Sequence, residues 1–99
     1  MCTTVTHKTN VQGSAKGPQG WFRVDTAIVS FDHPQHAPFD HSLNIDLMNE
    51  RAGAPTRVAI ELSAASARDL MTKIAAALEQ GEHEAGISPS PLVGEGAGG

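Results

Sequence analysis

The sequence predicts an α+β fold, an antiparallel sheet of four or five strands with one C-terminal helix packed on one face. Three observations predict it. Segments that alternate apolar and polar residues come first, one segment with helical periodicity follows them, and a stretch rich in Gly, Pro and Ser ends the chain. We therefore expect a single domain over residues 1–82 and a disordered tail over residues 83–99.

The first strand is predicted over residues 2–12, CTTVTHKTNVQ, because Thr and Val favour the extended backbone. Residues 13–20, GSAKGPQG, hold three glycines and a proline, which predicts a flexible loop. Residues 21–33, WFRVDTAIVSFDH, are again typical of a strand. The alternation of apolar residues changes phase near Asp25 and Thr26, which predicts a bulge or a bend there.

Two shorter strands are predicted over residues 41–48, HSLNIDLM, and residues 56–62, TRVAIEL, with a turn over residues 49–55. Their alternation is regular, which is typical of a sheet with one covered face. The residues that share this face are His41, Leu43, Ile45 and Leu47 in the first of them and Val58, Ile60 and Leu62 in the second.

A helix is predicted over residues 63–80, with Ser63 as its N-cap. Its apolar residues recur at intervals of three and four and form one stripe, which consists of Ala67, Leu70, Met71, Ile74, Ala75 and Leu78. Gly81 directly follows this pattern and predicts the end of the helix, because glycine adopts the left-handed conformation of a C-terminal stop.

Composition and charge narrow the function classes. The chain has 99 residues and a net charge of -4, and it has no basic stripe, so nucleic acid is not an expected partner. Its one cysteine excludes an internal disulfide scaffold. The N-terminal segment MCTTVTHKTN has no apolar core and no later run is long enough to span a bilayer, so we expect a cytoplasmic protein without a membrane partner.

The small size predicts a thin margin of stability, since a domain of about 80 residues buries only roughly 60–65% of its chain surface. A homodimer or a larger homo-oligomer is therefore expected, or support from a bound metal ion. The tryptophan, Trp21, opens the third segment and could act as an anchor in such an interface.

The segment FDHPQHAPFDHSLNID, residues 31–46, holds three of the five histidines, His33, His36 and His41. His33 shares a face with Phe31, and His41 shares a face with Leu43. If the two strands pair across the connecting loop, both imidazoles lie at one end of the apolar face. Two prolines in the loop restrict its backbone. They limit the entropy that is lost when His36 is held above the two imidazoles.

Three imidazoles with an open position suit Zn²⁺ or another divalent transition metal. His33, His36 and His41 are the main candidate ligands, and Cys2 and His7 are further candidates if the first strand lies alongside. Asp32 and Asp40 are candidates for the carboxylates that orient metal-bound histidines, although strand alternation directs Asp32 to the opposite face.

The spacing H-x2-H-x4-H is not specific, so several interpretations stay open. One is a divalent-metal-dependent enzyme that acts on a small organic molecule. A second is a non-enzymatic module that binds a metal or a small ligand, and a third is a homo-oligomeric assembly subunit. The same histidines could instead cap strand ends or carry out metal-free acid–base chemistry. No individual catalytic residue is predicted.

Four segments together resemble a small bacterial protein family of unknown function. They are MCTTVTHK, GSAKGPQGWFRV, FDHPQHAPFDHSLNIDL and RVAIELSAASARDL, and the resemblance covers about residues 1–80. It implies a short single-domain bacterial protein, and it implies no activity, ligand or catalytic residue.

Overall fold

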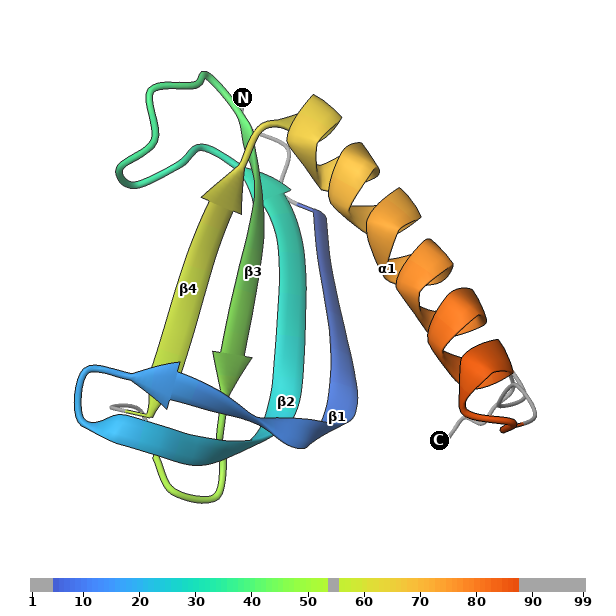
Figure 1. The fold of residues 1–99 in the computed structure, drawn as a ribbon. Coiled ribbons are helices and arrows are strands. Elements are labelled where there is room, and N and C mark those ends of the chain that lie inside the picture. The colour runs from blue at the N-terminus through green and yellow to red at the C-terminus, as the bar shows by residue number, and fades with distance from the viewer. Residues whose placement is uncertain (1–4, 54–55, 88–99) are drawn as a thin grey trace. The chain divides into compact units, whose positions relative to one another are not determined.

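The computed structural model describes residues 5–53 and 56–87. The elements in chain order are β1 (Val5–Gly17), β2 (Gly20–Asp32), β3 (Ser42–Met48), β4 (Arg57–Leu62) and α1 (Ala64–Glu84). The strands form one sheet in the order β1-β2-β3-β4, and every neighbouring pair is antiparallel (Figure 1). The predicted antiparallel sheet with one C-terminal helix is thus confirmed. The chain divides into two compact units, Met1–Ala64 with the sheet and Ala65–Gly99 with most of the helix.

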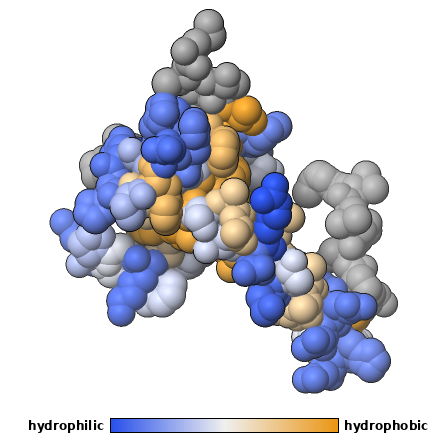
Figure 2. Space-filling view, turned by 90° about the horizontal axis from the view of Figure 1, so that it is seen from above, coloured by the Kyte–Doolittle hydropathy of each residue, from blue (hydrophilic) through white to orange (hydrophobic). Residues whose placement is uncertain are grey.

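One face of the sheet is apolar across β2, β3 and β4, and Val5 of β1 adds to it. Val29 is paired with His7 on one side and with Ile45 on the other, and Ile45 is paired with Ile60. By the alternation of strand residues, the same face carries Val5, Ala27, Phe31, Leu43, Leu47, Val58 and Leu62. The predicted apolar rows are therefore correct. Figure 2 shows hydrophobic residues gathered on the strand part of the molecule, with hydrophilic residues around them.

The hairpin between β1 and β2 is longer than predicted. The prediction of a loop over residues 13–20 is wrong, because β1 continues to Gly17 and only Pro18 and Gln19 separate it from β2. Gly17 is paired with Gly20, and Gly20 has a φ of 114°, a conformation that glycine adopts at little cost. Glycine lowers strand propensity, but here cross-strand pairing supplies the backbone hydrogen bonds that hold the segment extended.

The bulge predicted near Asp25 of β2 is present at that position along the sheet, but it lies in β1. The register shifts between Asn10 and Gly13 of β1, which face Thr26 and Val24 of β2. Two residues of β1 thus lie opposite one residue of β2, as in a β-bulge. Beyond this point the hairpin bends across the ends of β3 and β4, and β1 contacts β4, the opposite edge strand (Figure 1).

The buried hydrophobic side chains of the sheet lie near the bend. Val24 is 5% exposed and Ala27 is 7% exposed, and they are the buried hydrophobic side chains among the described residues. They lie on opposite faces of β2 by alternation, so the strand is covered on different sides before and after the bend. Two polar residues, Thr26 and Ser42, are also buried.

The helix begins directly after Ser63, as predicted, but it ends at Glu84 and not at Gln80. The stop is Gly86, with a φ of 71°, where the Gly86 N–H donates to His83 O and the Ile87 N–H donates to Glu82 O. This pair of bonds is the Schellman motif. Gly81 stays helical, since an interior glycine costs only about 1 kcal/mol and residues that tolerate a helix follow it.

Residues 88–99 of the predicted tail lie outside the described residues. No helix in the described ranges is both long enough and apolar enough to cross a membrane.

Candidate functional site

Two of the predicted site histidines lie against each other at one end of the apolar face. Asp32 at the end of β2 is paired with Ser42 at the start of β3, so the next residues outward are His33 and His41. Their ring centroids are 4.8 Å apart, and the ring planes differ by 28°. Phe31 stacks on His41 with a centroid distance of 5.6 Å and an interplanar angle of 7°. The predicted juxtaposition of His33 and His41 is therefore present.

A backbone carbonyl orients the His33 ring. His33 Nδ1 lies 2.8 Å from the carbonyl oxygen of Asp40, at the other end of the loop. A carbonyl oxygen only accepts hydrogen bonds, so Nδ1 donates its proton and the lone pair of the neutral ring lies on Nε2. Metal-binding histidines are usually oriented in this way by a carbonyl or a carboxylate.

The two aspartates predicted to support the histidines do so differently from the expectation. Asp40 contributes its main-chain oxygen to the His33 ring. Asp32 accepts a hydrogen bond from the backbone N–H of His33 through Oδ1, at 2.7 Å. Its pairing with Ser42 places it on the face opposite the imidazoles, as strand alternation predicted.

The loop that carries His36 is anchored to β4 by Glu61. The Glu61 carboxylate accepts N–H bonds from Gln35 at 2.6 Å, from His36 at 3.1 Å and from Ala37 at 2.8 Å. Successive backbone N–H groups of this kind form an anion-binding nest. The bonds from Ala37 and Gln35 are the main reason that the pKa of Glu61 is lowered, because they favour the charged carboxylate.

The described structure joins two of the predicted ligands and keeps the others apart. Within residues 5–53 and 56–87, no group of three or more His, Cys, Asp and Glu side chains has an arrangement that could hold a metal ion. His36 lies beside Glu61, which is paired with Asn44 on the polar face of the sheet. His7 is paired with Val29, four residues along β2 from His33, or about 13 Å at strand spacing. Cys2 lies outside the described residues.

The stacked arrangement limits what the pair can do without movement. Imidazole lone pairs lie in the ring plane, so the lone pairs of two stacked rings run side by side and do not meet at one atom. One ring must turn about its Cβ–Cγ bond before His33 and His41 can bind the same ion. The site can also contact an apolar group, because the Phe31 ring continues the stack and is 37% exposed.

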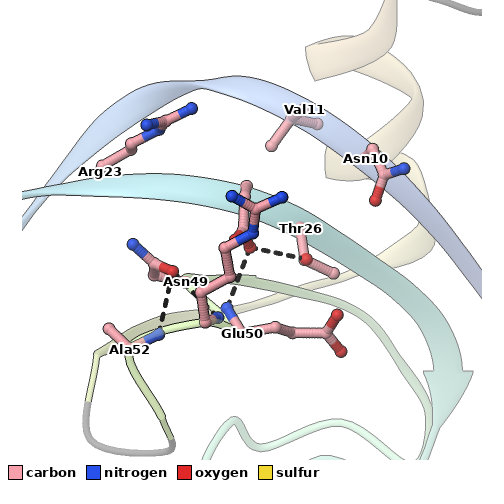
Figure 3. Close-up of a pocket in the computed structure, with 9 residues that line it drawn as sticks. Asn10, Val11, Arg23, Thr26, Asn49, Glu50 and Ala52 are labelled. Atoms are coloured by element: carbon pink, nitrogen blue, oxygen red, sulfur yellow. Dashed lines mark hydrogen bonds between the residues drawn. The ribbon is translucent and has the colours of Figure 1, made fainter.

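A second feature lies at the other end of the β2–β3 pairing. It is a hollow of about 490 Å³ between the β1–β2 bend and the turn after β3 (Figure 3). The residues that line it are Asn10, Val11, Arg23, Asp25, Thr26, Asn49, Glu50, Arg51 and Ala52.

Hydrogen bonds fix the turn that forms one wall of this hollow. Asp25 Oδ1 accepts the Glu50 backbone N–H at 2.9 Å and the Thr26 hydroxyl at 2.8 Å. The Glu50 N–H bond, then the Thr26 bond, lower the pKa of Asp25, and the charge of Arg51 adds a smaller effect. The carboxylate of Glu50 pairs with Lys8 Nζ at 2.7 Å.

Sequence reasoning assigned no site role to Glu61 or Phe31 and did not predict the hollow. Strand order alone could have pointed to Glu61, because the pairing of β4 with β3 brings this acid near the start of β3, where the histidine loop ends. The change in apolar alternation at Asp25 was weaker sequence evidence for the hollow. A bulge locally separates two strands and changes the direction of the neighbouring side chains.

Comparison with known proteins gives one informative result. Neither the curated proteins nor the solved structures gave a significant match. A family described as "Family of unknown function (DUF6295)" matches residues 1–87, which include the whole sheet, the histidine loop and the helix. The resemblance expected from the sequence is thus confirmed, and the chain belongs to the DUF6295 family.

Proposed function

We propose that His33 and His41 bind a divalent transition-metal ion, such as Zn²⁺, and that a small organic molecule reacts at this ion. The observation that carries the proposal is the pair itself, with ring centroids 4.8 Å apart. In Zn²⁺ sites the ion lies about 2.0–2.1 Å from each imidazole nitrogen, so two rings at this separation can share one ion after one of them rotates. The Asp40 carbonyl supplies the orienting bond that such a ligand needs.

The small number of protein ligands favours a reaction over a purely structural role. A structural zinc ion usually has four protein ligands, whereas a catalytic ion keeps a position for water or substrate. An ion held by His33 and His41 would keep such positions open, and it would make water bound there more acidic. The Phe31 ring next to His41 offers an apolar surface for the organic part of a substrate.

Isothermal titration of the untagged, metal-free chain with Zn²⁺ tests the proposal. We expect one ion per site, and we expect His33→Ala and His41→Ala each to weaken binding by roughly tenfold or more. His83→Ala is the matched control, because it removes one exposed imidazole from α1 and leaves the pair unchanged. Zinc binding that is the same in all four proteins would reject the site.

The spectrum of the Co²⁺-substituted protein separates an enzyme from a non-enzymatic binding module. An open site exchanges its water for small anions such as azide, and the visible absorption of Co²⁺ changes when it does. We expect that change. A spectrum that is insensitive to added ligands indicates a closed site and favours the binding module.

A second candidate function, a homo-oligomeric assembly subunit, has its own support. Val24 and Ala27 are the buried hydrophobic side chains among the described residues, whereas Trp21 at the hairpin tip is 71% exposed. Exposed aromatic residues of this kind often anchor protein interfaces. Light scattering tests this function: it predicts at least twice the 10.3 kDa mass of one chain, and Trp21→Ser should lower the mass. A monomer at every concentration would remove it.

A further inference from the structure

The hollow between the β1–β2 bend and the turn after β3 has the size of a small-molecule site. Its volume of about 490 Å³ lies within the range of about 300–1,000 Å³ that is typical of ligand pockets. It belongs entirely to residues 10–52 of the sheet unit, and the histidine pair lies at the other end of the β2–β3 pairing. A ligand bound here would therefore be separate from the proposed metal ion.

The acidic side chains of the hollow are already engaged. Asp25 is held by the Glu50 N–H and the Thr26 hydroxyl, and Glu50 is held by Lys8. These contacts fix the turn against β2. Each of the two carboxylates therefore already has a hydrogen-bond or ion-pair partner.

The two guanidinium groups form no ion pair with a described residue, although the charge of Arg51 acts on the Asp25 carboxylate. The guanidinium group of Arg23 makes no hydrogen bond or ion pair with any residue that the structure describes, while its backbone is paired with Ser14 of β1. Figure 3 shows its side chain reaching from β2 at one side of the hollow, with Asn10 of β1 at the other. Arg51 on the turn is held by its backbone N–H, which donates to Asn49 Oδ1 at 3.1 Å, and its side chain forms no ion pair within the described ranges.

Neutral hydrogen-bond donors and small apolar groups complete the lining. The amide groups of Asn10 and Asn49 provide N–H donors, while Val11 and Ala52 provide apolar surface. Guanidinium groups bind carboxylates and phosphates through two parallel N–H bonds. Because Asp25 and Glu50 line the same hollow, they repel a ligand with two negative charges more than a ligand with one.

We propose that this hollow binds a small aliphatic monocarboxylate, with its carboxylate on the guanidinium groups of Arg23 and Arg51 and its alkyl part against Val11 and Ala52. The site is independent of the histidine pair and of any metal ion there. No covalent step is involved.

Titration of the full-length, ¹⁵N-labelled chain with butanoate tests the proposal, in the presence of EDTA so that no metal ion contributes. We expect saturable shifts of the backbone amides of Arg23 and residues 49–52. Two other probes define the ligand class. Butanamide has the same shape without the charge, and inorganic phosphate carries more negative charge, so both should bind more weakly than butanoate.

Two variants and one control assign the site. Arg23→Gln and Arg51→Gln should each weaken butanoate binding by at least about tenfold, the usual effect of losing a charge-assisted bond. Arg68→Gln removes one exposed cation from α1 and should change the affinity by less than about twofold. If Arg51→Gln unfolds the turn, the Arg23→Gln variant alone tests the proposal, because Arg23 is an exposed strand residue. Unchanged binding in Arg23→Gln, equal loss in Arg68→Gln, or tighter binding of butanamide or phosphate would overturn the proposal.

Discussion

Glu61→Gln should release the histidine loop from the sheet. Glu61 accepts three backbone N–H bonds, at 2.6, 2.8 and 3.1 Å, from three consecutive loop residues. Glutamine has almost the same shape, but it has one acceptor oxygen in place of two, and its NH₂ group faces the donors. At most the bonds to a single oxygen can survive, and the negative charge that strengthens them is lost.

Hydrogen exchange measured by NMR gives the size of this effect. The amides of residues 35–37 should exchange about tenfold faster or more in Glu61→Gln, since a hydrogen bond to a charged acceptor is lost. Amides in the centre of β2 and β3 should not change, because their bonds are made within the sheet. Glu79→Gln on α1 is the control, since it makes the same chemical change at an exposed position. Unchanged exchange at residues 35–37 would refute the anchoring role of Glu61.

The same contacts predict the pH dependence of the loop. The pKa of Glu61 is lowered below its ordinary value of 4.5, first through the bond from Ala37 and next through the bond from Gln35. A lowered folded-state pKa means that the stabilisation is complete above 4.5 and is lost as the pH falls through the lower folded-state pKa. The amide signals of residues 35–37 should therefore move together at a midpoint below 4.5. A midpoint above 4.5 would contradict this sign.

Three substitutions in the long hairpin test how it is built, all by urea unfolding. Val24→Ala should lower the free energy of unfolding by about 2 kcal/mol, because two buried methyl groups are removed from a side chain that is 5% exposed. Gly20→Ala should cost about 1–3 kcal/mol, because Gly20 has a φ of 114°. Gly13→Ala should instead stabilise the fold by about 0.4–1 kcal/mol, because the added Cβ would lie 3.7 Å from Val24 Cγ2, an ordinary contact distance. Equal effects of the two glycine substitutions would contradict the conformational argument.

Strand alternation predicted most of the sheet because burial on one face imposes a period of two. The rows that include Val29, Ile45 and Ile60 follow directly from that period. The same reasoning placed His33 and His41 together, since they directly follow and precede paired strand residues. Local composition was a weaker guide in the segment after Asn10. There, pairing with β2 holds glycine-rich residues in a strand that their propensity disfavours.

Contacts between residues distant in sequence set the limit of the prediction. Glu61 is 24 to 26 residues from the amides it holds, and no local pattern encodes that contact. The position of His36 depends on this anchor, so its separation from the other two histidines could not be read from the spacing H-x2-H-x4-H. The end of the helix had a different cause. Both Gly81 and Gly86 fit a stop, and the hydrogen bonds of the Schellman motif form only at Gly86.

The most direct test of the shared histidine site is a long-range ¹H–¹⁵N spectrum of the imidazole side chains, recorded as Zn²⁺ is added to the untagged protein. Before addition, His33 should show a protonated Nδ1, as its bond to the Asp40 carbonyl requires. One nitrogen each of His33 and His41 should then shift together and stop shifting at one equivalent, while His7 and His83 stay unchanged. Shifts that are equal at all four histidines, or that affect His33 without His41, would contradict a shared ion.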